Sequence, residues 1–371
     1  MDDDAVLQDF RRKTWCLLGL PFDAVDLQAA VESIRRAAGS GRTCFFSTPN
    51  LNFAVSALGD ASFRQTLLNS DLSLLDGMPL LWAARILGIR LPEKVSGSDL
   101  FAALWQRPAS ENSSLKVFFF GGADGIAESA SRNIAAGGAG LQCAGFLNPG
   151  FGSIDELSNP EFLDRINRSD ADFLVVALGA RKGQMWIDRN RVNLNPPVVG
   201  HLGAVLNFVA GTVRRAPAWM QRAGLEWTWR IYEEPSLWRR YLFDGVRFAA
   251  IFLTRLLPYA LWRRFNPDRQ RRADSLVVNR EIEGDRLTIS IEGACLRDSI
   301  EPLRPLFTQA ALETRDVRLD LAGVSVVDGA FLGLCLVLKK HLDRSERRLE
   351  FVNPKPAVAR IFRWSCVEYL L

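Results

Sequence analysis

Histidine and closely paired cysteines are scarce in this chain of 371 residues. His occurs only twice, and no two of the six Cys have the CxxC spacing of zinc and redox sites. These absences argue against a Cys/His metal site and favour a reducing compartment, in which free thiols persist. The first twelve residues are acidic and then basic without a long apolar run. We therefore expect no signal peptide and a cytoplasmic protein.

A run of apolar residues long enough to cross a bilayer is also missing. The nearest candidate is the segment 243–262, which Asp244, Arg247 and Arg255 interrupt. Its uninterrupted apolar part, residues 248–253, is far shorter than the ~20 residues that a membrane-spanning helix needs. The three charges share one narrow sector of a helical wheel, which predicts a helix lying in the membrane interface. A helix buried against its own domain is the alternative.

Arginine is concentrated in residues 214–272, which contain thirteen Arg, no Lys and five acidic residues. The segment therefore carries +8 (13 − 5), whereas the whole chain carries +4, and it also holds five of the ten Trp. Guanidinium groups suit phosphates, and Trp suits a boundary between water and lipid. We expect a helical appendage that binds a phosphate-bearing partner near a membrane surface.

Up to about residue 212, short β-rich runs alternate with helical patterns. This alternation is typical of a Rossmann-like α/β sheet with helices on both faces. In such sheets ligands bind beyond the carboxyl ends of the strands. The residues that directly follow candidate strands are Thr48, Asn50, Asp76, Gly121, Gly122 and Gly179.

Several motifs resemble those of the WecG/TagA/CpsF glycosyltransferases, in the same order, over about residues 15–245. They include residues 47–50, 75–77 and 95–100, and the Arg-Ala-Pro-x-Trp, Gly-Leu-Glu-Trp and Glu-Glu-Pro sequences of the appendage. The resemblance implies an inverting glycosyltransferase that moves a sugar from a UDP-sugar to a polyprenyl-diphosphate-linked saccharide during bacterial surface polysaccharide biosynthesis. It also implies a peripheral protein at the cytoplasmic face of the inner membrane. Glucuronic acid, N-acetylmannosamine, its uronic acid and glucose all remain open as the transferred sugar.

The resemblance also implies roles for particular residues. Asp76 follows an apolar strand and precedes Gly77, so it is the candidate general base, with a helix cap as the alternative. Thr48 and Asn50 are implied to bind the donor sugar, although residues of these types around Pro49 also form turns. The other implied substrate-binding residues are Gly121, Gly122, Gly179, Gln184, Arg230, Arg239 and Arg240.

No metal or other cofactor is expected. Asp170 and Asp172 form a DxD sequence, but they precede a strand instead of following it, and therefore indicate a solvated strand entry. The sequence around Gln184 departs from the family pattern, and Leu237 stands where a third Arg is often found. His201 is interpreted as a structural residue rather than a base.

The pattern changes at about residue 275, where strand-like alternation resumes. Residues 317–333 and 351–354 resemble a STAS domain of the anti-sigma-factor-antagonist type. Regulatory members carry a phosphorylatable Ser or Thr after the Asp, but here Gly329 and Ala330 follow Asp328. We therefore expect constitutive docking of a protein partner, or self-association, through the surface formed by residues 328–333. We also expect transfer to remain measurable without this module.

The sequence thus predicts three parts: a Rossmann-like glycosyltransferase domain (1–212), an Arg/Trp-rich membrane-docking appendage and linker (213–272), and a small α/β STAS-like domain (275–371). The alternative is a non-catalytic regulatory or scaffold protein that acts through the STAS-like domain. Intact Thr48, Asn50 and Asp76 favour the enzyme. Nucleic-acid binding is disfavoured because the Arg run lacks Lys and is interleaved with bulky apolar residues.

Overall fold

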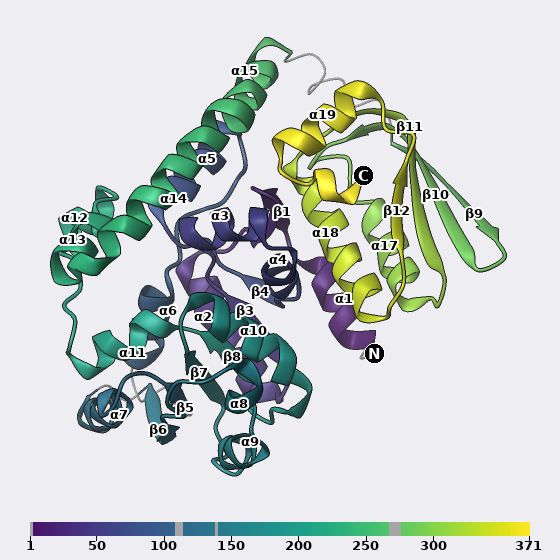
Figure 1. Cartoon of the computed structure of the whole chain (residues 1–371). Coiled ribbons are helices and arrows are strands. Elements are labelled where there is room, and N and C mark those ends of the chain that lie inside the picture. The colour runs from purple at the N-terminus through teal and green to yellow at the C-terminus, as the bar shows by residue number, and fades with distance from the viewer. Residues whose placement is uncertain (1–2, 108–113, 138–139, 267–275) are drawn as a thin grey trace. The chain divides into compact units, whose positions relative to one another are not determined.

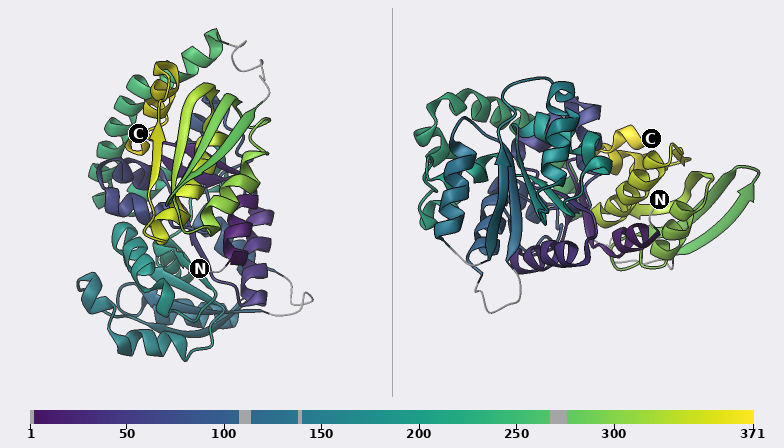
Figure 2. Two further views of the ribbon diagram at one scale, coloured as in Figure 1. Left: turned by 90° about the vertical axis from the view of Figure 1, so that its right-hand side faces the viewer. Right: turned by 90° about the horizontal axis from the view of Figure 1, so that it is seen from below.

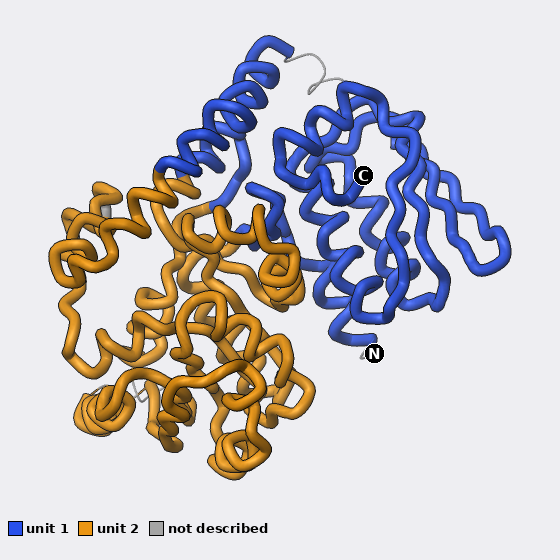
Figure 3. Tube along the Cα trace, in the orientation of Figure 1, with its two compact units in different colours: residues 1–24, 82–91, 246–371 blue, residues 25–81, 92–245 orange. Residues whose placement is uncertain are grey.

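The computed structural model describes residues 3–107, 114–137, 140–266 and 276–371 (Figure 1). The chain forms two compact units, which are described separately (Figure 3). Unit 1 comprises residues 1–24, 82–91 and 246–371, and unit 2 comprises residues 25–81 and 92–245.

Unit 2 is built on a six-stranded sheet with the strand order β4-β3-β8-β7-β5-β6. Every pair of neighbouring strands is parallel, so all carboxyl ends lie along one edge. The strands are β3 (Cys44–Ser47), β4 (Leu72–Ser73), β5 (Leu115–Gly121), β6 (Leu141–Leu147), β7 (Phe173–Ala177) and β8 (Val198–His201).

Both faces of this sheet are covered by helices. On β5, Phe119 joins one apolar core, whereas Phe118 and Phe120 join the core on the opposite face. This alternation follows from the two-residue period of a strand and requires cover on both sides. The helices are α2 (Leu27–Ser40), α3 (Leu51–Gly59), α4 (Ala61–Leu68), α6 (Gly97–Trp105), α7 (Ile126–Ala136), α8 (Ile154–Leu157), α9 (Pro160–Asn167), α10 (Ala180–Asn190) and α11 (Gly203–Ala210). The predicted α/β architecture is confirmed.

The described part of the Arg/Trp-rich segment, residues 214–266, is largely helical, as predicted, and residues 267–272 lie outside the described residues. In unit 2 it forms α12 (Ala218–Arg222), α13 (Glu226–Glu233) and the start of α14 (Trp238–Ile251). Unit 1 contains the end of α14, the π-helical turn Phe252–Leu256 and α15 (Leu257–Phe265). No helix within the described ranges is both long and apolar enough to span a membrane.

The C-terminal part of unit 1 is a four-stranded sheet with the order β12-β11-β10-β9 (Figure 2). β9 pairs antiparallel with β10, and the other neighbours are parallel. Its strands are β9 (Val277–Glu283), β10 (Arg286–Cys295), β11 (Asp316–Val327) and β12 (Leu349–Val352), and its helices are α17 (Leu303–Leu312), α18 (Gly329–Arg344) and α19 (Pro356–Trp364).

Unit 1 also contains the beginning of the chain. α1 (Asp3–Arg11) is followed by a hairpin of β1 (Thr14–Leu17) and β2 (Leu20–Asp23), in which all eight strand residues are buried. α5 (Met78–Ile86) begins in unit 2 and ends in unit 1. The two ends of the sequence therefore share one compact unit.

Candidate functional site

Asp76 lies beyond the carboxyl end of β4, where three loops meet. Its backbone N–H donates to the carbonyl of Pro49 at 3.1 Å, and the N–H of Val95 donates to the carbonyl of Leu75 at 2.8 Å. A Cβ on Gly97 would lie 3.5 Å from the hydroxyl oxygen of Thr48. The structure therefore brings together residues 48–50, 75–77 and 95–99.

Four charged side chains act on Asp76. Burial raises the pKa of the Asp76 carboxyl to about 7, while Lys94 and Arg215 lower it and Glu226 and Asp99 raise it. Lys94 Nζ lies 3.1 Å from Glu226 Oε2 and 3.7 Å from Asp99 Oδ2, and Arg215 Nη2 lies 2.5 Å from Asp99 Oδ1. A carboxylate with a pKa near 7 is well suited to accept a proton at neutral pH.

This pKa predicts how the rate of transfer depends on pH. If Asp76 acts as a base, only its ionised form is active, so kcat/KM should fall about tenfold per pH unit below pH 7 and level off above it. Lys94→Met removes a charge that lowers this pKa and should move the midpoint to higher pH. Initial rates between pH 5 and 9 would check both statements, and a midpoint near pH 4 in the wild-type protein would contradict the assignment.

The same ion pairs attach the appendage to the loop beside Asp76. Arg215 and Glu226 belong to the Arg/Trp-rich segment, whereas Lys94 and Asp99 flank the start of α6. Sequence reasoning did not select Lys94, Arg215 or Glu226 as site residues. Arg215 and Glu226 belong to the motifs that carry the family resemblance, and Lys94 adjoins one of them. Their position in or beside these motifs is the sequence feature that could have identified them as site residues.

Thr48 and Asn50 lie on the loop between β3 and α3. Thr48 is buried, and Asn50 caps α3 by accepting a hydrogen bond from the N–H of Phe53 at 3.1 Å. The cap engages Oδ1 of Asn50 and does not involve its amide nitrogen. Asn52, in the first turn of α3, donates to buried Asp244 of α14 at 2.9 Å and so ties α14 to the same region.

The three predicted glycines lie at the ends of the neighbouring strands β5 and β7. Gly121 and Gly122 have φ values of +105° and +89°, and a Cβ on Gly121 would lie 2.5 Å from the carbonyl oxygen of Ala177. The close contact between the ends of β5 and β7 is therefore enough to explain why residue 121 has to be a glycine. Gly179 has a φ of +81°, and no described residue other than its chain neighbours comes within 4 Å of where a Cβ would be, so the space beside it is open.

Gln184 and His201 present buried polar atoms. Gln184 is fully buried, and neither its amide oxygen nor its nitrogen has a hydrogen-bond partner among the described residues; the same holds for Nε2 of His201. Burial lowers the pKa of His201 to about 4, against the opposing effect of a hydrogen bond with the Gly179 backbone, so its ring is neutral and a weak base. Unpaired buried polar atoms are costly and indicate a place where a polar ligand binds.

The three predicted arginines differ in their surroundings. Arg230 of α13 is largely buried, with its guanidinium 5.4 Å from the ring centre of Phe208 and 3.4 Å from Glu234. Arg239 and Arg240 of α14 are exposed. Of the three, Arg230 has the more enclosed environment, which suits binding of a diphosphate.

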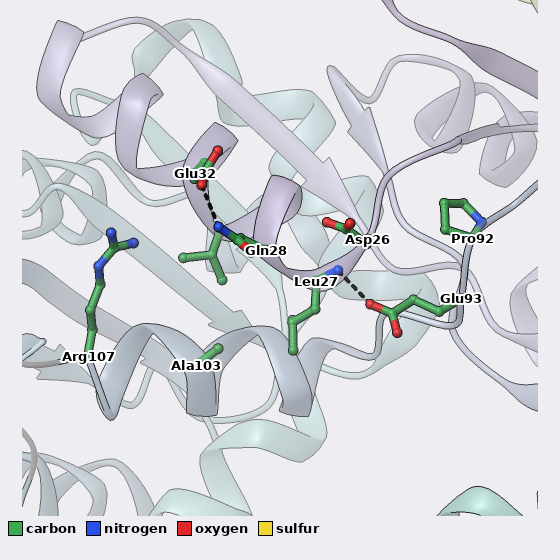
Figure 4. Close-up of a pocket in the computed structure, with 9 residues that line it drawn as sticks. Asp26, Leu27, Gln28, Glu32, Pro92, Glu93, Ala103 and Arg107 are labelled. Atoms are coloured by element: carbon green, nitrogen blue, oxygen red, sulfur yellow. Dashed lines mark hydrogen bonds between the residues drawn. The ribbon is translucent and has the colours of Figure 1, made fainter.

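A separate pocket of about 640 Å³ lies in unit 2 between α2, α6 and the loop at Pro92 and Glu93 (Figure 4). The N–H of Leu27 donates to Glu93 there at 2.8 Å, and Gln28 donates to Glu32 at 3.1 Å. None of the predicted site residues lines this pocket. In the part of the chain that the structure describes, no three His, Cys, Asp or Glu side chains form a group that would hold a metal ion.

Comparison with known proteins agrees with the motifs. Residues 15–261 match the model of the glycosyl transferase WecG/TagA/CpsF family, and residues 278–371 match a model described as "Mlab, STAS domain". Two curated relatives, from Bacillus spizizenii (strain ATCC 23059 / NRRL B-14472 / W23) and Bacillus subtilis (strain 168), are both named N-acetylglucosaminyldiphosphoundecaprenol N-acetyl-beta-D-mannosaminyltransferase. Each is 27% identical to this chain, over 53% of this chain and 74% of its own length.

A solved structure of the Bacillus cell fate determinant SpoIIAA in its phosphorylated form is similar to part of the chain. It shares 18% identity, covers 25% of this chain and 87% of its own, and has a TM-score of 0.23. The family model spans more than half of the residues. The chain therefore belongs to the WecG/TagA/CpsF family of glycosyltransferases and carries a C-terminal STAS domain.

Proposed function

We propose that this glycosyltransferase moves a sugar from a UDP-sugar to a polyprenyl-diphosphate-linked saccharide with inversion at the sugar carbon, during bacterial surface polysaccharide biosynthesis. The observation that carries the proposal is Asp76, a carboxylate with a pKa of about 7 at the meeting point of three family motifs. The two relatives are named as mannosaminyltransferases, so N-acetylmannosamine is the first sugar to test. Family membership favours this enzyme over a purely regulatory protein.

In the proposed mechanism Asp76 accepts the proton of the acceptor hydroxyl as its oxygen attacks the anomeric carbon of the donor. The bond to UDP breaks, and negative charge develops on the leaving diphosphate. Positioned cations stabilise such charge best in a partly dry site. We assign this task to Lys94, without a metal ion, and we assign Arg230 to the diphosphate of the acceptor. Gln184 and His201 bind polar groups of the donor with their unpaired atoms.

The direct test incubates the full chain with undecaprenyl-diphosphate-linked N-acetylglucosamine and each of four UDP-sugars: those of N-acetylmannosamine, its uronic acid, glucuronic acid and glucose. Chromatography of the lipid product measures transfer, and NMR of the new glycosidic bond reports inversion. Transfer with one donor that persists in EDTA supports the proposal. A folded protein that uses none of these donors, or that needs a divalent cation, contradicts the corresponding part.

Arg230→Ala should weaken use of the acceptor. Loss of one charge-assisted hydrogen bond costs about 1.5–3 kcal/mol, which corresponds to a rise of ~10- to 100-fold in the acceptor KM. Arg240→Ala should have a smaller effect because Arg240 is exposed. UDP-sugar binding, measured by calorimetry, should not change. Arg168→Ala, at an exposed arginine directly after α9, is the control, and acceptor kinetics in Arg230→Ala equal to that control would remove Arg230 from the site.

We also propose that α14 docks on the membrane surface. Large apolar side chains on it are exposed, and Arg239 and Arg240 lie among them. Exposed apolar groups close to arginines suit insertion into the headgroup region of anionic lipid. The exposed apolar residues of α14 are Trp238, Leu242, Phe243 and Val246.

A triple variant of the full chain, Leu242→Gln with Phe243→Gln and Val246→Gln, should lose binding to anionic vesicles. Each apolar side chain withdrawn from lipid costs about 1.5–3 kcal/mol, so the partition coefficient should fall by ~10³-fold or more. High salt should weaken wild-type binding without abolishing it. Phe151→Gln with Val192→Gln, at exposed apolar positions elsewhere, is the control. Equal sedimentation of all three proteins with vesicles would place the anchor elsewhere.

A further inference from the structure

The surface of the STAS domain that was expected to meet a partner is already covered. Gly329 and Gly333 on α18 are buried. A Cβ on Gly329 would lie 3.1 Å from the carbonyl oxygen of Cys16, and one on Gly333 would overlap the carbonyl of Thr14. The backbone of β1 therefore lies directly on α18. The expectation that residues 328–333 contact an outside protein is corrected: a partner or second copy would have to bind elsewhere on the domain.

Charged groups are buried in the same contact. Asp9 of α1 lies 2.6 Å from Lys340 Nζ, 3.0 Å from His341 Nε2 and 3.0 Å from Arg12 Nη1. Burial alone would raise the pKa of the Asp9 carboxyl, but Lys340, Arg12 and His341 outweigh it and hold that pKa well below its usual range. The Lys340 side chain is only 1% exposed. A lysine is almost never buried to this degree without a paired anion, so α18 requires the N-terminal helix as its partner.

Further hydrogen bonds hold the N-terminal segment at its other edges. The N–H of Gly19 donates to the carbonyl of Ser365 at 2.9 Å, and the hydroxyl of Tyr369 donates to the carbonyl of Gly19 at 2.9 Å. Arg304 of α17 donates to the carbonyls of Phe10 and Arg12 at 2.7 and 2.9 Å. Contacts with α17, α18 and the C-terminal segment of the STAS domain thus hold residues 3–23 in place.

The end of α5 belongs to the same unit. A Cβ on Gly329 would lie 3.5 Å from Ile89, which follows α5, and a Cβ on Gly88 would lie 2.8 Å from the guanidinium of Arg263 on α15. α5 begins at Met78, two residues after Asp76. The helix that starts beside the candidate base is therefore held at its far end within the unit that contains the STAS domain.

We propose that the STAS domain of this chain is a clamp that acts in cis: its α18 face binds residues 3–23 of the same chain and, by holding the end of α5, positions Asp76 for transfer. The positioning part rests on the proposed function, whereas the clamp itself does not. Asp76 remains the group that touches substrate, and Asp9 and Lys340 are positioning residues.

A double-mutant cycle on Asp9 and Lys340 in the full chain tests the clamp. Lys340→Met leaves Asp9 buried without its main partner, so hydrogen exchange of the β1 and β2 amides should accelerate by ~10²-fold or more. Asp9→Leu should act likewise, and the double variant should recover most of the protection because no unpaired charge remains. Lys339→Met, one residue along α18, is the control. Unprotected hairpin amides in the wild-type protein, or strictly additive effects of the two substitutions, would overturn the clamp.

Transfer kinetics on the same proteins test the positioning. Lys340→Met should lower kcat by ~10-fold while leaving the dissociation constant of the UDP-sugar unchanged, and the double variant should recover kcat. Altered exchange with unchanged kcat would overturn the link to Asp76 and retain the clamp. A wild-type protein that is inactive with every donor would overturn the proposed function, and hydrogen exchange would still decide the clamp.

Discussion

Asp76→Asn is expected to lose nearly all transfer while the chain stays folded and still binds its UDP-sugar. A positioned general base contributes ~10²- to 10⁴-fold to the rate, and Asn cannot accept the proton of the acceptor hydroxyl. Asn matches Asp in size, so the loop contacts at Pro49 and Leu75 should survive. Single-turnover rates measured beside calorimetric donor binding would separate chemistry from binding. Turnover near the wild-type level would remove Asp76 from the catalytic role.

The same substitution should stabilise the protein at alkaline pH. The folded state raises the pKa of Asp76 from 3.8 to about 7, so the carboxyl contributes most to stability when protonated, and that contribution is lost as pH rises through 7. Asn carries no such charge. At pH 8 it should gain about 2–4 kcal/mol, from a pKa shift of ~3 units at 1.36 kcal/mol each, discounted for partial exposure.

Thermal melts at pH 4.5 and pH 8 would show this gain growing with pH. Asp60→Asn is a control whose effect on stability at high pH should have the opposite sign, because hydrogen bonds from the Phe63 backbone and Arg181 lower the pKa of Asp60. A gain for Asp76→Asn that does not depend on pH would contradict the assigned cause.

Deleting residues 276–371 is expected to leave an insoluble or unfolded chain. The deletion removes α18, against which the hairpin packs, and uncovers Trp15, Leu17, Leu20 and Phe22, which are all buried. Each such side chain is worth about 1.5–3 kcal/mol when fully buried, so the loss of about 6–12 kcal/mol is comparable to the whole stability of a typical domain. This reverses the expectation that transfer would remain measurable without the module.

Soluble yield and the unfolding midpoint of the truncated chain would check the expectation. Removing residues 1–24 together with 276–371 takes away the uncovered hairpin as well and should recover part of the solubility. A truncated chain that is soluble and melts like the full protein would show that the hairpin does not need its cover.

The sheet of unit 2 and the neighbourhood of Asp76 could be predicted because both depend on local sequence. Strands such as β5 and β7 are apolar runs, and parallel strands place the loops that follow them at one edge. The ion pairs of Lys94 and Arg215 could not be predicted in the same way. From sequence alone, a charged residue is expected to be solvated. The ion-pair partners of Lys94 and Arg215 are more than 100 residues away along the chain, so no local pattern indicates them.

The contact between α1 and α18 could not be predicted from the sequence either, because its partners are far apart along the chain. Asp9 and Lys340 are separated by 331 residues, and neither stands in a motif that indicates burial. In the sequence, Gly333 looks like an ordinary glycine within a helix. Only the structure shows that a side chain there would overlap the carbonyl of Thr14. The cover of α18 comes from tertiary structure, which the sequence of this helix does not indicate.

The cysteine thiols of unit 1 can be used to measure how often this unit opens. Cys16 lies on β1, Cys335 on α18, and Cys295 and Cys366 on neighbouring parts of the unit, and all four are buried. Burial raises the pKa of each, to about 11 for Cys366, so none is a reactive thiolate at neutral pH while the unit stays closed. Alkylation of Cys16 and Cys335 must therefore wait for the hairpin to leave α18. The rate at which a thiol reagent modifies these two cysteines measures how often that separation occurs, without any engineered probe.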